Sequence, residues 1–209
     1  MKITVFALAM ILAGFSGHAA NGINDVQKTN SKVLIVPLNE NVASNYYPLS
    51  MMAEELNIGV DSVVFVLNQM VAESISESNS LFINAFNCKS KATLDKIQQQ
   101  IKLEEVSSEI KTSDLSAVSD DDYKNLIDQT EVGYVVFING YYITKKEKPF
   151  NTIFHTISFS VFDSKKKKVM DSSNFYNTFD LISFSEIKNA SKKCTLKMTQ
   201  AIIKKANKI

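Results

Sequence analysis

The chain has 209 residues, of which 45% are hydrophobic and 22% charged, and its formal net charge at pH 7 is +1. This length suits a single domain with a sizeable core, and the near-balanced charge gives no reason to expect a nucleic acid as partner. All 23 basic residues are lysines, which excludes the bidentate clamping of carboxylates or phosphates that arginine provides.

The amino terminus has the three parts of a secretory signal peptide. A lysine follows the first Met, an apolar run covers residues 3–14, and small residues end at Ala19 and Ala20. We therefore predict a signal peptide over residues 1–20, cleaved after Ala19 or Ala20, and a periplasmic or secreted protein. The apolar run is shorter than the roughly 20 residues of a membrane span. The first cysteine is Cys88, so we expect no lipid anchor at the cleavage site.

The first half of the predicted mature chain alternates strands and helices. Residues 21–31 are polar and predict a flexible lead-in. Residues 32–38 hold a run of aliphatic residues, which is typical of a buried strand. After this strand we expect a short helix over 50–56, an amphipathic helix over 62–78 with Asp61 as its N-cap, a strand over 81–86, and a more polar helix from 91 to about 108.

The second half changes to long strands. After a polar connection over 113–119, Asp120, Asp121 and Asp122 place negative charge at the start of a third helix, where the helix dipole favours it. Strands follow over 133–143, 152–162 and 169–178, joined by a turn at 145–149 and a charged hairpin tip at 163–168. A last helix begins at Ser185, and its predicted apolar stripe includes Cys194 and Leu196.

The predicted order is strand, helix, strand, two helices, three strands and a helix (β-α-β-α-α-β-β-β-α). We predict one α/β (α+β) domain over residues 32–209, with a single mixed sheet of about five strands and helices packed on it.

Four segments resemble a group of bacterial envelope domains. Residues 33–38 are similar to the "V-x-V-x-P-F" start of these domains, and the helix 62–78 with the strand 81–86 is similar to their first helix-to-strand step. Residues 122–143 resemble their "helix, A-D-Y-V-L-x-G" passage. The hairpin 157–170 resembles their "L-x-D-x-x-T-G-x-V" hairpin, although Lys166 and Lys167 stand where Thr-Gly is usual.

The group includes the amino-terminal domain of the Tol-system propeller protein, the periplasmic domain of the curli-secretion lipoprotein, and the lipoprotein activators of penicillin-binding proteins. The resemblance implies a non-enzymatic role in docking to other envelope proteins or in assembly. It carries over no catalytic residue, because the group has no shared active site.

Few side chains of the predicted mature chain are suited to catalysis. His155 lies on the apolar face of its strand, so we interpret it as a core histidine, with a catalytic base or a pH-sensitive group as alternatives. Cys88 and Cys194 either form a disulfide in an oxidising compartment or remain buried thiols. No metal-ligand spacing and no glycine-rich phosphate loop occurs in the sequence, so we expect no metal and no cofactor.

Two features remain as candidate contacts. Lys165, Lys166, Lys167 and Lys168 either dock to an acidic partner or anionic lipid headgroups, or only keep the hairpin tip soluble. Tyr46 and Tyr47, in a loop over residues 39–48, belong to a residue type that is enriched at interfaces. We expect one member of this pair, and one of Tyr141 and Tyr142, to lie in the core.

The sequence therefore predicts an exported, non-enzymatic envelope binding or assembly accessory protein that acts through protein–protein contacts. Its partners would be other envelope proteins, of unknown identity. A carrier of a small apolar or lipid ligand is one alternative, and a hydrolase that uses His155 is another.

Overall fold

The computed structural model describes residues 31–38, 41–107, 109–148, 152–178 and 183–206. The predicted signal peptide and the predicted lead-in up to residue 30 lie outside the described residues. So do residues 39–40 of the predicted loop that holds the two tyrosines, and residues 149–151, the first of which ends the predicted turn.

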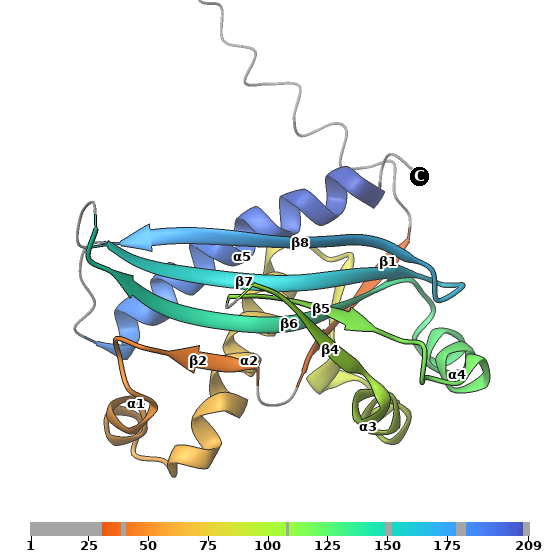
Figure 1. Ribbon diagram of the computed structural model, residues 1–209. Coiled ribbons are helices and arrows are strands. Elements are labelled where there is room, and N and C mark those ends of the chain that lie inside the picture. Colours follow the sequence, from red (N-terminus) through yellow and green to blue (C-terminus); the bar gives the residue numbers. More distant parts are fainter. Residues whose placement is uncertain (1–30, 39–40, 108, 149–151, 179–182, 207–209) are drawn as a thin grey trace, which may run out of the picture.

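A mixed sheet of six strands organises the fold. The strands are β1 (Lys32–Pro37), β2 (Val42–Ser44), β3 (Phe82–Asn84), β6 (Val132–Lys146), β7 (Thr152–Asp163) and β8 (Lys168–Thr178). They lie in the order β3-β1-β6-β7-β8, and β2 pairs with the second half of β6. Pairings with β1 and β2 are parallel, whereas β6, β7 and β8 form an antiparallel meander (Figure 1). The predicted α/β class with one main mixed sheet is confirmed.

Helices cover both faces of this sheet. One face is covered by α1 (Leu49–Leu56), α2 (Val60–Ser78) and α5 (Phe184–Ala206). The other face carries the 3₁₀ turn η2 (Ala85–Asn87), α3 (Lys91–Gln100) and α4 (Asp120–Thr130). The apolar run in β1 is continuous because alternate residues enter the two opposite cores, with Val33 and Ile35 in one core and Leu34 and Val36 in the other.

A hairpin replaces the second half of the predicted helix 91–108. The helix α3 ends at Gln100, and the chain continues as β4 (Lys102–Ser107), which pairs antiparallel with β5 (Ile110–Asp114). Part of the predicted polar connection 113–119 is therefore strand. The helical prediction beyond residue 100 is wrong because Val106 is 67% exposed and continues no apolar stripe, while Leu103 packs against the core from a strand.

The helices differ from the prediction in one N-cap and in one residue of a buried stripe. Gly59 occupies the N-cap position of α2, so Asp61 lies in the first turn and is not the cap. Ser119 caps α4 through a hydrogen bond from Asp122 N–H, and three aspartates lie in its first turn as expected. Leu196 is 48% exposed, so it does not belong to the buried stripe of α5, whereas Cys194 is fully buried.

A β-bulge in β6 changes which residues point to each face of the sheet: even-numbered residues face the core under α2 and α5 before the bulge, and odd-numbered residues do so after it. Ile138 pairs with Phe159 and Gly140 pairs with Ser158, which leaves Asn139 as the extra residue. Before the bulge Ile138 faces the core beneath α2 and α5, and after it Tyr141 and Ile143 do. Tyr142 is buried as well, at 7% exposure, so both tyrosines of this pair lie inside the protein.

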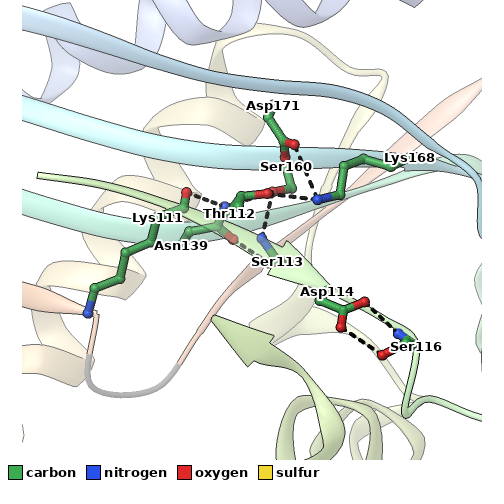
Figure 2. A network of polar contacts seen from close by, with 9 residues as sticks. All are labelled: Lys111, Thr112, Ser113, Asp114, Ser116, Asn139, Ser160, Lys168 and Asp171. Carbon is green, nitrogen blue, oxygen red and sulfur yellow. Dashed lines mark hydrogen bonds and ion pairs between the residues drawn. The ribbon is translucent and has the colours of Figure 1, made fainter. Parts of the chain in front are cut away.

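The hairpin β4–β5 docks on the sheet through hydrogen bonds between small polar side chains (Figure 2). Ser160 of β7 accepts a hydrogen bond from Ser113 N–H at 2.9 Å and one from Asn139 Nδ2 at 2.8 Å. Asn139 Nδ2 also donates to the carbonyl of Lys111, and its oxygen accepts from the Ser113 hydroxyl. Asn139, Ser113 and Ser160 are fully buried, so the bulge directs a buried amide into the contact that holds the hairpin.

Candidate functional site

The predicted contact residues Tyr46 and Tyr47 are mostly engaged within the fold. Tyr47 is 4% exposed, and its hydroxyl donates to Glu55 of α1. Burial, with the carboxylate of Glu55 beside it, raises the pKa of Tyr47 to about 12. Glu55 also accepts from Phe184 N–H at 2.7 Å, at the start of α5. Tyr46 is half-buried against the core, with the ammonium of Lys145 5.4 Å from its ring centre. Glu55 therefore joins α1 to the start of α5, and Tyr47, buried beside it, offers no docking surface.

The lysines at the tip of the β7–β8 hairpin divide into two pairs. Lys166 donates to the carbonyl of Val118 and to Asp120, and Lys168 donates to Thr112 at 2.7 Å and pairs with Asp171. The side chains of Lys165 and Lys167 are exposed and have no partner among the described residues. Only half of the predicted basic tip is thus available to a partner.

His155 is a buried core residue, as predicted. Its Nδ1 lies 3.0 Å from the Tyr141 hydroxyl oxygen, and its Nε2 has no partner among the described residues. Burial lowers the pKa of His155 to about 4. The side chain is fully enclosed, so solvent does not reach it.

Cys88 and Cys194 are both unpaired thiols in the structure, which corresponds to the second of the two alternatives from the sequence. Cys194 lies in the core between the sheet and α5, and Cys88 packs against the core on the opposite face. The sheet separates the two sulfurs. Burial raises the pKa of the Cys194 thiol to about 12.

A groove lies where the chain leaves the carboxyl ends of β1 and β3. The connection after β1 leads to α1 and α2 on one face, and the connection after β3 leads through η2 to α3 on the other. Such a divergence opens a crevice beyond the ends of two parallel strands. The groove has a volume of about 810 Å³ and is lined by Pro37, Asn68, Phe86 and Leu94, among others.

Apolar surface is concentrated at this groove. Phe65 and Phe86 meet edge to face with ring centres 5.2 Å apart, and they are 55% and 39% exposed. Val60, which is 48% exposed, also lines the groove. Three of the seven exposed large hydrophobic side chains among the described residues therefore share one groove. Exposed apolar surface gathered in this way is typical of binding sites.

Polar groups complete the walls of the groove. Asp61 of α2, Asp95 of α3 and Lys91 line it, and Lys91 is the one cation among these lining residues. Asn68 is 5% exposed, and its Nδ2 donates to the carbonyl of Leu38 and to Asn41 Oδ1 at 2.8 Å. Asn68 Oδ1 has no hydrogen-bond partner among the described residues. The groove therefore combines an aromatic rim with a few fixed polar groups.

This groove was not predicted from the sequence. Phe65 and Phe86 stand in apolar runs that we assigned to a helix and a strand, and nothing in their spacing marks them as exposed. The only sequence signal is Phe65 itself. It is an aromatic residue between two apolar neighbours on α2, at a position turned away from Val63 and Leu67. Among the described residues no group of three or more His, Cys, Asp or Glu side chains is placed to hold a metal ion.

Comparisons with known proteins show only distant similarity. No family model matches the sequence, and no curated protein resembles it significantly. The hypothetical protein CT253 from Chlamydia trachomatis is 11% identical, with a TM-score of 0.44 over 84% of this chain and 98% of that one. A PelC dodecamer from Paraburkholderia phytofirmans is 9% identical, with a TM-score of 0.39 over 81% and 86% of the two chains.

The lipoprotein GNA1162 from Neisseria meningitidis is 12% identical, with a TM-score of 0.37 over 80% of this chain and 96% of that one. Similarity at this level supports no statement about shared function or assembly.

Within the described residues no single helix has the length and apolar character of a membrane span. The helices α1 and α2 reach that length and apolar character only when taken together, and they are bent by 83° relative to each other.

Proposed function

We propose that this protein is an exported, non-enzymatic accessory protein of the bacterial envelope that binds a partner protein in the groove between α2 and α3. The observation that carries the proposal is the exposed Phe65–Phe86 pair at the mouth of an 810 Å³ groove. The envelope location is supported by the signal-peptide pattern of residues 1–20.

The shape of the groove supports a short apolar segment as its occupant. On α2 the lining residues Val60, Val64 and Asn68 repeat every four positions, so two turns of the helix form one wall. Two turns span about 11 Å, which is the length of a few residues of a bound chain. An aromatic or aliphatic anchor packed against the Phe65–Phe86 pair would supply most of the binding energy, as is usual at hot spots.

A photo-crosslinking experiment in the native host tests this proposal. A photoreactive phenylalanine analogue is placed at Phe65 or Phe86, and in a control at Val106, which is 67% exposed but does not line the groove. We expect the groove positions to crosslink to one defined envelope protein and the control not to do so. Equal crosslinking from Val106, or none from the groove, would contradict the proposal.

The purified partner then provides an affinity measurement. Truncating Phe86 to alanine is expected to weaken binding at least tenfold, in line with the loss of an aromatic anchor. Because Phe86 is only 39% exposed and contacts Phe65, circular dichroism and thermal melting check that the variant still folds. Unchanged affinity of the Phe86→Ala variant would remove the groove from the interface.

A carrier of a small apolar or lipid ligand is a second candidate function. The groove volume of about 810 Å³ lies within the range of about 300–1,000 Å³ that is usual for small-ligand pockets. Native mass spectrometry of the protein purified from its host separates the two candidates. A carrier retains a bound molecule of defined mass, and that mass is lost in a Phe65→Asp variant. The hydrolase alternative finds no support in the position of His155, which is enclosed.

A further inference from the structure

The helix α5 carries a concentrated positive charge. Over Phe184–Ala206 it holds six lysines and a single acidic residue, Glu186, so its side chains contribute a formal charge of +5. The whole chain has a net charge of +1, and the remainder is therefore −4 by subtraction. By contrast, α2 carries three acidic residues and no lysine, and α4 carries four aspartates and one lysine. Positive charge is segregated on one helix.

These lysines form one solvent-facing array. The exposed ones follow the outer face of the helix (Lys188, Lys192, Lys193, Lys197 and Lys204), and Lys205 is half-buried. None of the six forms an ion pair with an acidic side chain among the described residues. Lys188 and Lys192 are four residues apart, as are Lys193 and Lys197. Like charges at that spacing repel and destabilise a helix, and no acidic residue separates them.

Two of the lysines are held in place at the edge of the sheet. Lys193 donates to the Tyr176 hydroxyl at 2.8 Å, and Lys197 donates to the carbonyl of Phe175 at 2.9 Å while its ammonium lies 5.4 Å from the Phe175 ring centre. Leu196 lies between them on the helix and is 48% exposed, and Phe175 is 52% exposed. The basic face thus presents two apolar side chains amid its charges.

The shape of this face favours a planar anionic surface as its partner. The helix α5 lies across one face of the sheet, behind β7 and β8 (Figure 1), and its 23 residues span about 34 Å. It lines neither the groove nor the smaller hollow beside Tyr142, so the lysines lie apart from both of these concave sites. An extended array of lysine ammonium groups with shallow apolar side chains matches a planar anionic surface.

We propose that α5 binds this protein peripherally to anionic phospholipid membranes, with the lysines against the headgroups and Leu196 and Phe175 at the interface. This surface is separate from the groove, and the inference does not depend on the proposed function. The sequence suggested the hairpin tip as a contact for lipid headgroups, but Lys166 and Lys168 of that tip are bound to other parts of the protein. We therefore place the lipid contact on α5.

Vesicle sedimentation with the full mature chain tests the proposal. Vesicles of phosphatidylcholine with phosphatidylglycerol are compared with vesicles of phosphatidylcholine alone, at low and high ionic strength. The test variant is K188Q/K192Q/K204Q, whose three side chains have no partner among the described residues. The matched control is K124Q/K165Q/K167Q, which removes the same charge from exposed lysines of α4 and the hairpin tip. Circular dichroism and thermal melting check that both fold.

We expect the wild type to bind only the anionic vesicles and to be released by salt, because a short Debye length screens these contacts. At about fivefold per lysine, the test variant should lose about a hundredfold in partition coefficient, and the control should retain most of its binding. Equal losses in both variants would assign the effect to net charge and overturn the proposal. Absence of wild-type binding to vesicles, with binding to polyglutamate retained, would overturn it in favour of an acidic protein partner.

Discussion

Buried polar side chains distinguish this protein at the scale of single residues. His155 and Tyr141 contact each other between the sheet and α5, and Asn139 is enclosed beneath the hairpin. The alternation along β7 places His155 among apolar residues, so its burial was predictable from the sequence. The contact of His155 with Tyr141 was not, because the bulge at Asn139 decides which tyrosine of the pair faces α5.

Protonation of His155 should destabilise the folded protein in mild acid. Its pKa is lowered from 6.5 to about 4 in the folded state, so the unfolded chain binds one more proton between these two pH values. Folding free energy contributed by neutral His155 is complete above pH 6.5 and is lost as the pH falls toward 4. At about 1.4 kcal/mol per pH unit, the loss approaches about 3 kcal/mol.

Denaturant unfolding of the wild type and a His155→Asn variant at several pH values measures this effect. The variant is less stable at neutral pH but should lose less stability between pH 6.5 and 4, since its side chain does not titrate. Carboxylates contribute equally to both curves and cancel in the difference. Parallel curves for the two proteins would show that His155 does not titrate in this range.

At the scale of elements, the hairpin β4–β5 shows what local periodicity misses. Leu94, Ile97 and Ile101 have helical spacing, which led to the prediction of one long helix, but α3 ends at Gln100. Beyond that residue the chain pairs with β5 and docks on Ser160, which lies 47 residues away from Ser113 in the sequence. A window of a dozen residues contains no information about such a partner.

Removal of the Ser160 hydroxyl should loosen the hairpin. In a Ser160→Ala variant, Ser113 N–H loses its acceptor and Asn139 loses one of its own. Buried groups left without partners cost about 1–3 kcal/mol. Amide hydrogen exchange over residues 102–114 is therefore expected to accelerate at least fivefold, while exchange within β6 changes less.

Ser172 supplies the matched control for this substitution. It lies on β8 of the same sheet, and its hydroxyl has no hydrogen-bond partner in the described part of the chain. Ser172→Ala should leave exchange in the hairpin unchanged. If Ser160→Ala also leaves it unchanged, the polar layer does not hold the hairpin.

The sheet decides the arrangement at the scale of the whole molecule. It separates two cores that each receive helices, and it places Cys88 against one core and Cys194 in the other. Its parallel half also creates the groove, because consecutive connections diverge to opposite faces. Neither the separation of the cysteines nor the groove is visible in the spacing of residues along the chain.

Thiol titration tests the separation of the cysteines. In the native protein we expect only Cys88, which is half-buried, to react with a thiol reagent, because Cys194 is fully buried and its pKa is raised to about 12. After unfolding without reductant, both thiols should react. A Cys88→Ala variant should show no native thiol. Reaction only after reduction would establish a disulfide and a different fold for this part of the chain.

The sequence by itself determined the α/β class, the long strands of the meander, most of the helices and the burial of His155, because alternation and helical spacing record which side of each element meets a core. Only the tertiary structure decided the bulge at Asn139, the hairpin β4–β5, the exposed Phe65–Phe86 groove and the unpaired array of lysines on α5. These features depend on contacts between residues far apart in the chain. Local patterns report that a face is buried, but they do not identify the element that covers it.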